Sequence, residues 1–247
     1  MRKLGARLTF AAALSAVALS GGGCATPGPL HVYSVATATA PEIRDEGPAP
    51  AISVPTFLAA GESITGFAYD PFTDHFFLRL APGNRIRVVD RPARAIKREF
   101  TVEKLPTDGG GDLALRPRDG RLFLALTHEP ALMELSRFGD FVRQIALDAP
   151  AAGVAIDATR DHMLTLDETG KKITVHDLAG AALAQISLDR AVALGSLGYD
   201  GDRREIYAPL AGNATIGVFD EHGRLQRKLP IAAEFLDVGP RSFLRMF

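Results

Sequence analysis

Two histidines are the first side chains to consider as metal ligands. His75 and His162 each stand five residues after an aspartate, Asp70 and Asp157, within the same repeated pattern. Imidazole nitrogens bind zinc at about 2.0–2.1 Å, so the ligands of one ion must converge on one point. Equivalent positions of two separate repeats lie in separate structural units and cannot share an ion. We therefore interpret the match between these histidines as repeat ancestry.

Other familiar catalytic patterns are missing from the sequence. The run Asp108–Asp112 (DGGGD) lacks the Lys-Ser/Thr of a phosphate loop and leads into an expected strand instead of a helix. No serine stands in a Gly-x-Ser-x-Gly elbow. The single cysteine, Cys24, excludes an internal disulfide and a Cys-x-x-Cys-His haem site. The sequence indicates no cofactor and favours a protein that is not an enzyme.

A repeat positions these side chains, and it is defined by five anchor residues. The anchors are Asp70, Arg116, Asp157, Asp200 and Asp237. Apolar residues stand six and seven positions after every anchor, and in the first four copies a further apolar strand ends in a turn twenty positions after it. Three positions beyond that turn residue stand Gly139, Gly180 and Gly223, as tight hairpins require.

The anchor spacings of 46, 41, 43 and 37 residues match the length of a propeller blade. Each unit is predicted to be four short strands joined by hairpins, with the anchor aspartates starting the first turn by bonding their own backbone. We predict an all-β fold, a five-bladed β-propeller of four-stranded antiparallel blades. An open β-solenoid or a sandwich is the alternative.

The two chain ends are predicted to complete the last blade together. Copy five stops at Phe247 after two strands, while Leu30–Ser34 has the pattern of a third strand and Ile52–Leu58 can be a fourth. Such pairing of N- and C-terminal strands removes the free edges of an open array. The insert Val35–Ala51, with its charged run Glu42–Glu46, is predicted to be a solvated loop.

The first-strand segments carry a resemblance to a known superfamily. G-F-A-Y-D (Gly66–Asp70) and G-V-A-I-D (Gly153–Asp157) resemble first strands of NHL-type and gluconolactonase-like propeller blades, and the likeness covers about residues 64 to 247. Gluconolactonase-like propellers hold a divalent metal with acidic and asparagine side chains that project into the channel. A hard cation needs about six oxygens from different directions.

That implied metal site finds little support at the corresponding positions. Four residues before the anchors stand Gly66, Asp112, Gly153, Ser196 and Ala233. One acidic residue among five positions supplies too few oxygen ligands for such an ion, so we expect no bound metal. The weaker alternative is a metal in the channel with Asp112 and Glu234 among its ligands. The acids of neighbouring loops are interpreted as solvated side chains: Glu62, Asp108, Glu129 and Asp189.

Candidate ligand-binding residues lie in the loops between second and third strands. Asn84 and Asn213 resemble the asparagine that precedes the third strand of NHL blades and shapes its loop. His128 and Glu129 form a polar cluster in the corresponding loop of copy two. Propellers commonly bind ligands on this face, so these four residues are the predicted ligand face.

The N-terminus has the pattern of an export signal. Three basic residues within the first seven precede the apolar run Leu8–Leu19, which is shorter than the ~20 residues of a membrane span. Ser20–Gly23 followed by Cys24 resembles a bacterial lipobox, although Gly21 departs from its branched aliphatic residue. We assign residues 1–23 to a signal peptide, 24–29 to a lipidated tether and 30–247 to one propeller domain. Ala25 implies delivery to the outer membrane, facing the periplasm; an ordinary cleaved signal is the alternative.

Composition narrows the functional classes. The chain is 47% hydrophobic and 23% charged, and removal of the signal leaves 25 basic against 29 acidic residues, which favours no nucleic-acid partner. We expect a non-catalytic binding or scaffolding lipoprotein, with a metal-dependent hydrolase or lactonase acting in the channel as the alternative. Its partners are predicted to be the membrane and a membrane-bound protein or envelope ligand. The tether is expected to leave from the side of Asn84, His128 and Asn213.

Overall fold

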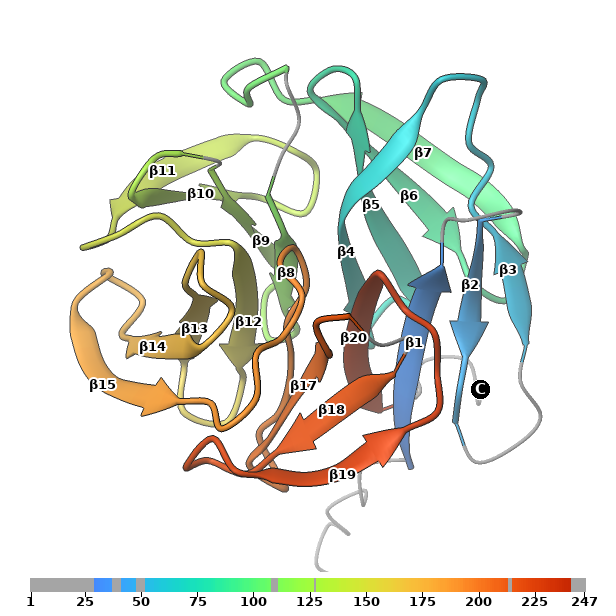
Figure 1. Cartoon of the computed structure of the whole chain (residues 1–247). Helices are drawn as coiled ribbons and strands as arrows, with labels where there is room; N and C mark the ends of the chain where they lie inside the picture. Colours follow the sequence, from blue (N-terminus) through green and yellow to red (C-terminus); the bar gives the residue numbers. More distant parts are fainter. Residues whose placement is uncertain are drawn as a thin grey trace, which may run out of the picture.

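Most strands form where apolar residues run without interruption, because a strand inside a propeller is covered on both faces. The computed structural model describes residues 29–36, 41–47, 52–107, 111–126, 128–212 and 215–240. These residues form five four-stranded antiparallel sheets, arranged around a central axis as the blades of a propeller (Figure 1). The predicted five-bladed propeller is confirmed.

The strands fall into four classes by their distance from the axis. The inner strands are β4 (Ser63–Asp70), β8 (Leu113–Arg116), β12 (Gly153–Asp157), β16 (Gly198–Asp200) and β20 (Phe235–Pro240). The second strands are β5 (His75–Ala81), β9 (Arg121–Ala125), β13 (His162–Leu166), β17 (Glu205–Pro209) and β1 (Leu30–Ala36). The third strands are β6 (Arg85–Asp90), β10 (Ala131–Leu135), β14 (Lys172–His176), β18 (Ile216–Phe219) and β2 (Glu42–Asp45). The outer strands are β7 (Ala95–Thr101), β11 (Phe141–Ala146), β15 (Ala182–Ser187), β19 (Leu225–Leu229) and β3 (Ser53–Pro55).

Blades 1 to 4 each use four consecutive strands, from β4 to β19, and the closing blade has the order β20-β1-β2-β3. Each inner strand lies beside those of both neighbouring blades, and β20 lies beside β4, so the ring is closed. Because the strands alternate in direction, the turns that follow inner and third strands lie on one face of the ring. We call this the turn face. The opposite side, with the loops between second and third strands, is the loop face.

Closure takes one C-terminal and three N-terminal strands, which corrects the predicted two-plus-two arrangement. β1 pairs with β20 from Leu30 opposite Pro240 to Val35 opposite Phe235, so Leu30–Ser34 belongs to a second strand, not a third. The second strands β1 and β5 and the third strand β6 each have five buried residues in a row. Second and third strands are thus equally apolar, and hydropathy alone does not separate them. The apolar pair of copy five, Phe243 and Leu244, lies outside the described residues.

The charged run predicted to be a loop instead supplies the third strand of the closing blade. β2 pairs with β1 and β3, and its side chains alternate between core and solvent. Ile43 is fully buried, while Arg44 is exposed. Asp45 is also buried, and its Oδ1 lies 2.5 Å from His31 Nδ1 and accepts the N–H of Gly47. The contacts with His31 and Gly47, together with the strand pairing of β2, compensate for the loss of water around the buried Asp45 carboxylate.

The predicted Asp turns are confirmed in three of the blades. The Oδ1 atoms of Asp70, Asp157 and Asp200 accept backbone N–H bonds from the residues two positions later, at 2.9, 2.9 and 3.0 Å. The hairpin glycines Gly139, Gly180 and Gly223 have φ of +97°, +99° and +80°. The described residues contain no helix that is long and apolar enough to cross a membrane.

Candidate functional site

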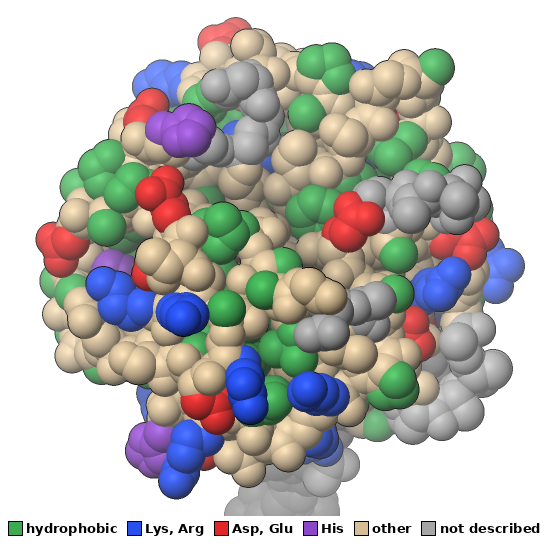
Figure 2. Space-filling model, in the orientation of Figure 1, with side chains coloured by type: hydrophobic (Ala, Val, Ile, Leu, Met, Phe, Trp, Pro, Cys, Tyr) green, Lys and Arg blue, Asp and Glu red, His purple; other side chains and the backbone are tan. Residues whose placement is uncertain are grey.

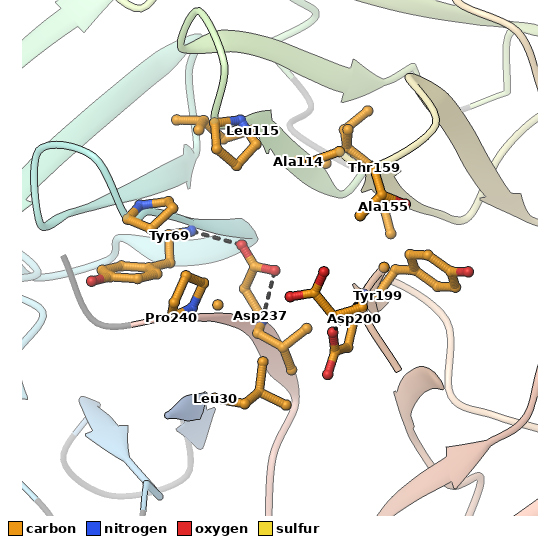
Figure 3. A pocket seen from close by; sticks show the side chains of 18 of the residues that line it. Leu30, Tyr69, Ala114, Leu115, Ala155, Thr159, Tyr199, Asp200, Asp237 and Pro240 are labelled. Atoms are coloured by element: carbon orange, nitrogen blue, oxygen red, sulfur yellow. Dashed lines mark hydrogen bonds between the residues drawn. The ribbon is translucent and has the colours of Figure 1, made fainter. Parts of the chain in front are cut away.

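A cavity of about 480 Å³ opens on the turn face, at the end of the central channel. Its walls come from the ends of the inner strands and from the turns that follow them, together with Leu30 at the start of β1. Ala114, Ala155 and Val238 provide much of the apolar lining, and Tyr69 and Tyr199 contribute from opposite sides (Figure 3). We call this cavity the turn-face pocket.

Asp237 lines the pocket from a level of the inner strand at which the other blades have small residues. Hydrogen bonds across the channel show which inner-strand residues correspond: Asp112 Oδ2 accepts the N–H of Val154 and Leu197, and Ser196 Oγ accepts that of Leu236. The residue that follows each of these three N–H donors is Ala155, Gly198 or Asp237. Counting back from the strand ends places Ala68 and Ala114 at the same level in blades 1 and 2. Only the closing blade therefore carries an ionisable side chain at this level.

The surroundings of Asp237 favour its neutral form. Its Oδ2 accepts the backbone N–H of Tyr69 at 2.8 Å, and its Oδ1 accepts that of Val238 at 2.8 Å (Figure 3). The carboxyl is enclosed by protein except where it lines the pocket. Loss of water around the charge outweighs the two hydrogen bonds and raises the pKa of Asp237 to about 7.

Asp200 is a second carboxyl of the turn-face pocket. Its Oδ1 accepts the N–H groups of Asp202 and Arg203, and the Arg203 guanidinium lies 3.9 Å from its Oδ2. Desolvation by burial raises its pKa, although those two backbone bonds act in the opposite direction. Figure 3 shows the carboxylates of Asp200 and Asp237 directed into the cavity. The pocket thus combines apolar walls with the carboxyl groups of Asp200 and Asp237, and its lining also includes the exposed side chains of Asp202 and Arg203.

The other end of the channel is crossed by Asp112. Its Oδ2 accepts N–H bonds from blades 3 and 4, so the side chain spans from its own blade to the far side of the channel. Asp112 is 1% exposed, and its Oδ1 has no hydrogen-bond partner within the described residues. Burial raises the pKa of Asp112 well above its usual value. Asp112 therefore closes the channel where the sequence alternative expected a metal.

Beside Asp112 lies a buried arginine that the sequence analysis missed. Arg79 Nη1 donates to the backbone oxygens of Gly111 and Ala125, at 3.2 and 2.8 Å. The side chain is fully buried. A basic residue within the apolar second strand HFFLRLA was the available signal, because a buried guanidinium needs acceptors nearby. Its contacts hold the backbone from which Asp112 projects.

The four predicted ligand-face residues are not part of this pocket. Asn84 lies in the β5–β6 loop of the loop face and donates from Nδ2 to Val102 O at 2.9 Å, which connects this loop to the residue after β7. His128 and Glu129 are exposed in the β9–β10 loop. Asn213 lies outside the described residues. A second cavity, between blades 3 and 4, is also lined by none of the four.

The metal alternative does not match the donor geometry. Asp112 is buried at the channel, whereas Glu234 is exposed just before β20. His75 and His162 begin second strands of blades 1 and 3, as the repeat predicted. In the part of the chain that the structure describes, no group of three or more His, Cys, Asp or Glu side chains could hold a metal ion.

Solved structures with low sequence identity to this chain share its β-propeller fold. No family model and no curated protein matches the sequence. A chain of a nidogen/laminin complex superposes with a TM-score of 0.58 at 11% identity, covering 86% of this chain and 99% of that one. Myxococcus xanthus glutaminyl cyclase superposes with a TM-score of 0.55 at 16% sequence identity. The match covers 68% of this chain and 70% of the cyclase chain. Kuenenia stuttgartiensis hydrazine synthase superposes with a TM-score of 0.48 at 12% sequence identity. The match covers 70% of this chain and about half (51%) of the synthase chain.

Proposed function

We propose that the chain is a non-catalytic binding protein of the bacterial cell envelope, held at the outer membrane by lipid on Cys24, whose ligand enters the turn-face pocket. The observation that carries the binding role is the Asp237 carboxyl, which stands in the pocket where the other blades have alanine or glycine. The segments Gly66–Asp70 and Gly153–Asp157 support an NHL-type propeller as the finer family assignment.

The chemistry of the pocket favours a small ligand with an apolar body and a cationic amine. Within the described residues no basic side chain forms an ion pair with Asp237, and its hydrogen bonds come from backbone N–H groups. An ammonium group beside Asp237 would compensate for the water lost around the carboxylate and lower its pKa. The apolar walls would gain about 25 cal/mol for each Å² that the body of the ligand covers.

Binding is favoured over hydrolysis because the hydrogen-bonding groups of the pocket serve the fold. The hydroxyl of Thr159, which lines the pocket, donates to Asp157 within the turn after β12. The Asp200 carboxylate accepts two N–H bonds within the turn after β16. These groups form local turns. The arrangement therefore supports recognition of a ligand by Asp237 and the walls.

Calorimetric titration with benzylammonium, compared with benzyl alcohol, tests the binding role. We expect benzylammonium to bind more tightly at pH 8 than at pH 5, because Asp237 must lose its proton to attract the cation. Asp237→Asn should weaken amine binding at least about tenfold, while benzyl alcohol should bind both proteins alike, since a charge-assisted bond contributes about 1.5–3 kcal/mol. Glu129→Gln on the loop face is the matched control and should bind as the parent does.

Two outcomes of this experiment would contradict the proposal. Equal amine affinity in the parent and in Asp237→Asn would remove Asp237 from the binding site. A stoichiometric metal that survives dialysis and is lost in Asp112→Ala would favour the metal-dependent hydrolase or lactonase acting in the channel.

The lipid anchor is supported by the sequence pattern and is tested separately. Cys24 follows an apolar run and four small residues, and it is the only cysteine of the chain. We expect labelled palmitate to be incorporated into the parent protein but not into Cys24→Ser, and the variant to move from the membrane fraction to the soluble fraction. Membrane retention of unlabelled Cys24→Ser would contradict lipid attachment at this residue.

A further inference from the structure

Two exposed phenylalanines lie in turns of neighbouring blades on the turn face. Phe72, in the turn after β4, is 56% exposed, and Phe138, in the turn after β10, is 64% exposed. Arg137, which directly precedes Phe138 in the chain, has its guanidinium 5.8 Å from the Phe72 ring centroid and 3.2 Å from Asp70 Oδ2. Exposed aromatic rings on neighbouring turns form an apolar patch of the kind that marks a contact surface. We call Phe72, Phe138 and the arginines beside them the aromatic patch.

A cation without an ion pair lies within the aromatic patch. The Arg98 guanidinium stands 4.7 Å from the Phe138 ring centroid, and its Nη2 donates to Arg137 O at 2.7 Å. Within the described residues Arg98 forms no salt bridge, and burial, with the neighbouring Arg137 charge, lowers its pKa. An arginine held over an aromatic ring without a carboxylate is suited to an external anionic group such as a phosphate.

Both ends of the described chain reach the same face. Leu30 and Pro240 are paired, and both line the turn-face pocket. Cys24 is separated from Leu30 by five residues, which span at most about 17–20 Å. The predicted side of the tether is therefore wrong: the chain enters the fold from the turn face because Leu30 begins a second strand. A lipid on Cys24 would hold the turn face close to the bilayer.

The composition of the C-terminal sequence agrees with this placement. Residues 241–247 (RSFLRMF) follow Pro240 directly and contain two arginines, two phenylalanines, a leucine and a methionine, with no acidic residue. Basic and large apolar residues together are typical of segments that bind the interface of anionic bilayers. Figure 2 shows one face of the molecule, over which acidic and basic side chains are interspersed.

We infer that the aromatic patch of the turn face lies against an anionic phospholipid surface, so that the turn-face pocket opens toward the bilayer. The inference rests on the lipid anchor of the proposed function, which supplies the proximity. Phe72 and Phe138 enter the interface, and Arg98 meets lipid phosphate. A ligand of the pocket then arrives from the membrane side, which fits an amphipathic molecule with an amine head.

A tryptophan reporter tests the contact, because the natural chain contains no tryptophan. We would compare Phe138→Trp with Leu194→Trp, a position of the loop face that is 51% exposed. The lipidated full chain is reconstituted in phosphatidylglycerol vesicles, and emission and quenching by brominated acyl chains are recorded. Phe138→Trp should shift to shorter wavelength and be quenched, and Leu194→Trp should do neither.

The failure of the anchor and the failure of the contact give different results. If the protein floats with vesicles whether or not Cys24 is present, lipid attachment at Cys24 is contradicted. Quenching of Phe138→Trp by added vesicles then still tests whether the aromatic patch contacts the bilayer. If the protein floats but neither tryptophan is quenched, or Leu194→Trp responds more strongly, the contact is wrong. An emission already shifted without vesicles, and reversed by removing residues 241–247, would show that the chain covers its own patch and would also overturn the inference.

A binding measurement on unlipidated protein gives the energetic test. In the Cys24→Ser background, Phe72→Ser with Phe138→Ser should weaken binding to phosphatidylglycerol vesicles at least about tenfold, which corresponds to about 1.4 kcal/mol, because both apolar rings are removed from the interface. Both side chains are exposed, so the variant should fold normally. Leu194→Ser is the matched control and should bind as its parent does. Equal binding of the three proteins would overturn the inference.

Discussion

Asp237 is the one residue at its level of the inner strands that can carry a charge, because its counterparts in the other blades are alanine or glycine. Two of the small residues at its level, Ala114 and Ala155, line the turn-face pocket with it. A carboxyl there has few water molecules around it, while its two backbone N–H bonds keep its orientation fixed. The same residue is therefore costly for folding when ionised and useful for recognising a cation.

The raised pKa of Asp237 predicts how stability changes with pH. The folded protein holds this proton up to about pH 7, whereas the unfolded chain releases it near pH 4. Between those values the folded state binds more protons, so the free energy of unfolding falls as pH rises. Asp237→Asn cannot ionise and should lose less stability between pH 5 and pH 8, by on the order of 1 to 3 kcal/mol.

Urea denaturation of the parent and of Asp237→Asn at both pH values measures this difference. The variant also loses one N–H bond, because an amide has only one oxygen, but that loss is the same at each pH. Asp112 and Asp200 retain their own raised pKa values, so part of the pH dependence should remain. The exposed substitution Glu168→Gln is the control. Equal slopes for parent and Asp237→Asn would contradict the assignment.

The sequence identified Asp237 as notable but assigned it the wrong role. It was matched to the turn-starting aspartates Asp70, Asp157 and Asp200, whereas it stands in the middle of β20. The short anchor spacing of 37 residues was the signal of a shifted register. The turn aspartates themselves follow from local backbone chemistry and were predictable. The pocket was not, because it depends on residues contributed by all five blades.

At the scale of single elements, β2 shows that a charged segment can be a strand. Its four residues alternate in burial, and Ile43 packs with Tyr33, Val35 and Val54 in the core of the closing blade. Alternation over four residues is a weak signal within a run of charges, so the sequence favoured a loop. The repeated strands of blades 1 to 4 were easier to predict because each copy supported the others.

The packing of β2 predicts opposite results for two neighbouring substitutions. Ile43→Ala removes a fully buried side chain and should lower the free energy of unfolding by about 2–4 kcal/mol. Arg44→Ala removes an exposed side chain of the same strand and should change it by less than about 0.5 kcal/mol. Chemical denaturation of both variants provides the measurement. Equal, small effects would show that this segment is not packed as a third strand.

For the whole molecule, the closing blade determines whether the ring can form. Removing residues 237–247 would leave β1 without most of its inner partner, exposing a strand edge and opening the contact between β20 and β4. We expect this truncation to aggregate or to lose its cooperative thermal transition. A truncation after Pro240 keeps all of β20 and should melt within a few degrees of the parent. Similar melting of both truncated proteins would contradict closure by β20.

The same closing blade also imposes an order on the synthesis of the protein. Its second, third and outer strands are made first, but their inner strand follows about 180 residues later. At about 5–20 residues per second, a ribosome needs on the order of ten to forty seconds to supply it. During that interval the earliest strands have no partner on one edge. Blades 1 to 4 can each form from consecutive strands, but the ring closes only after β20 has been made.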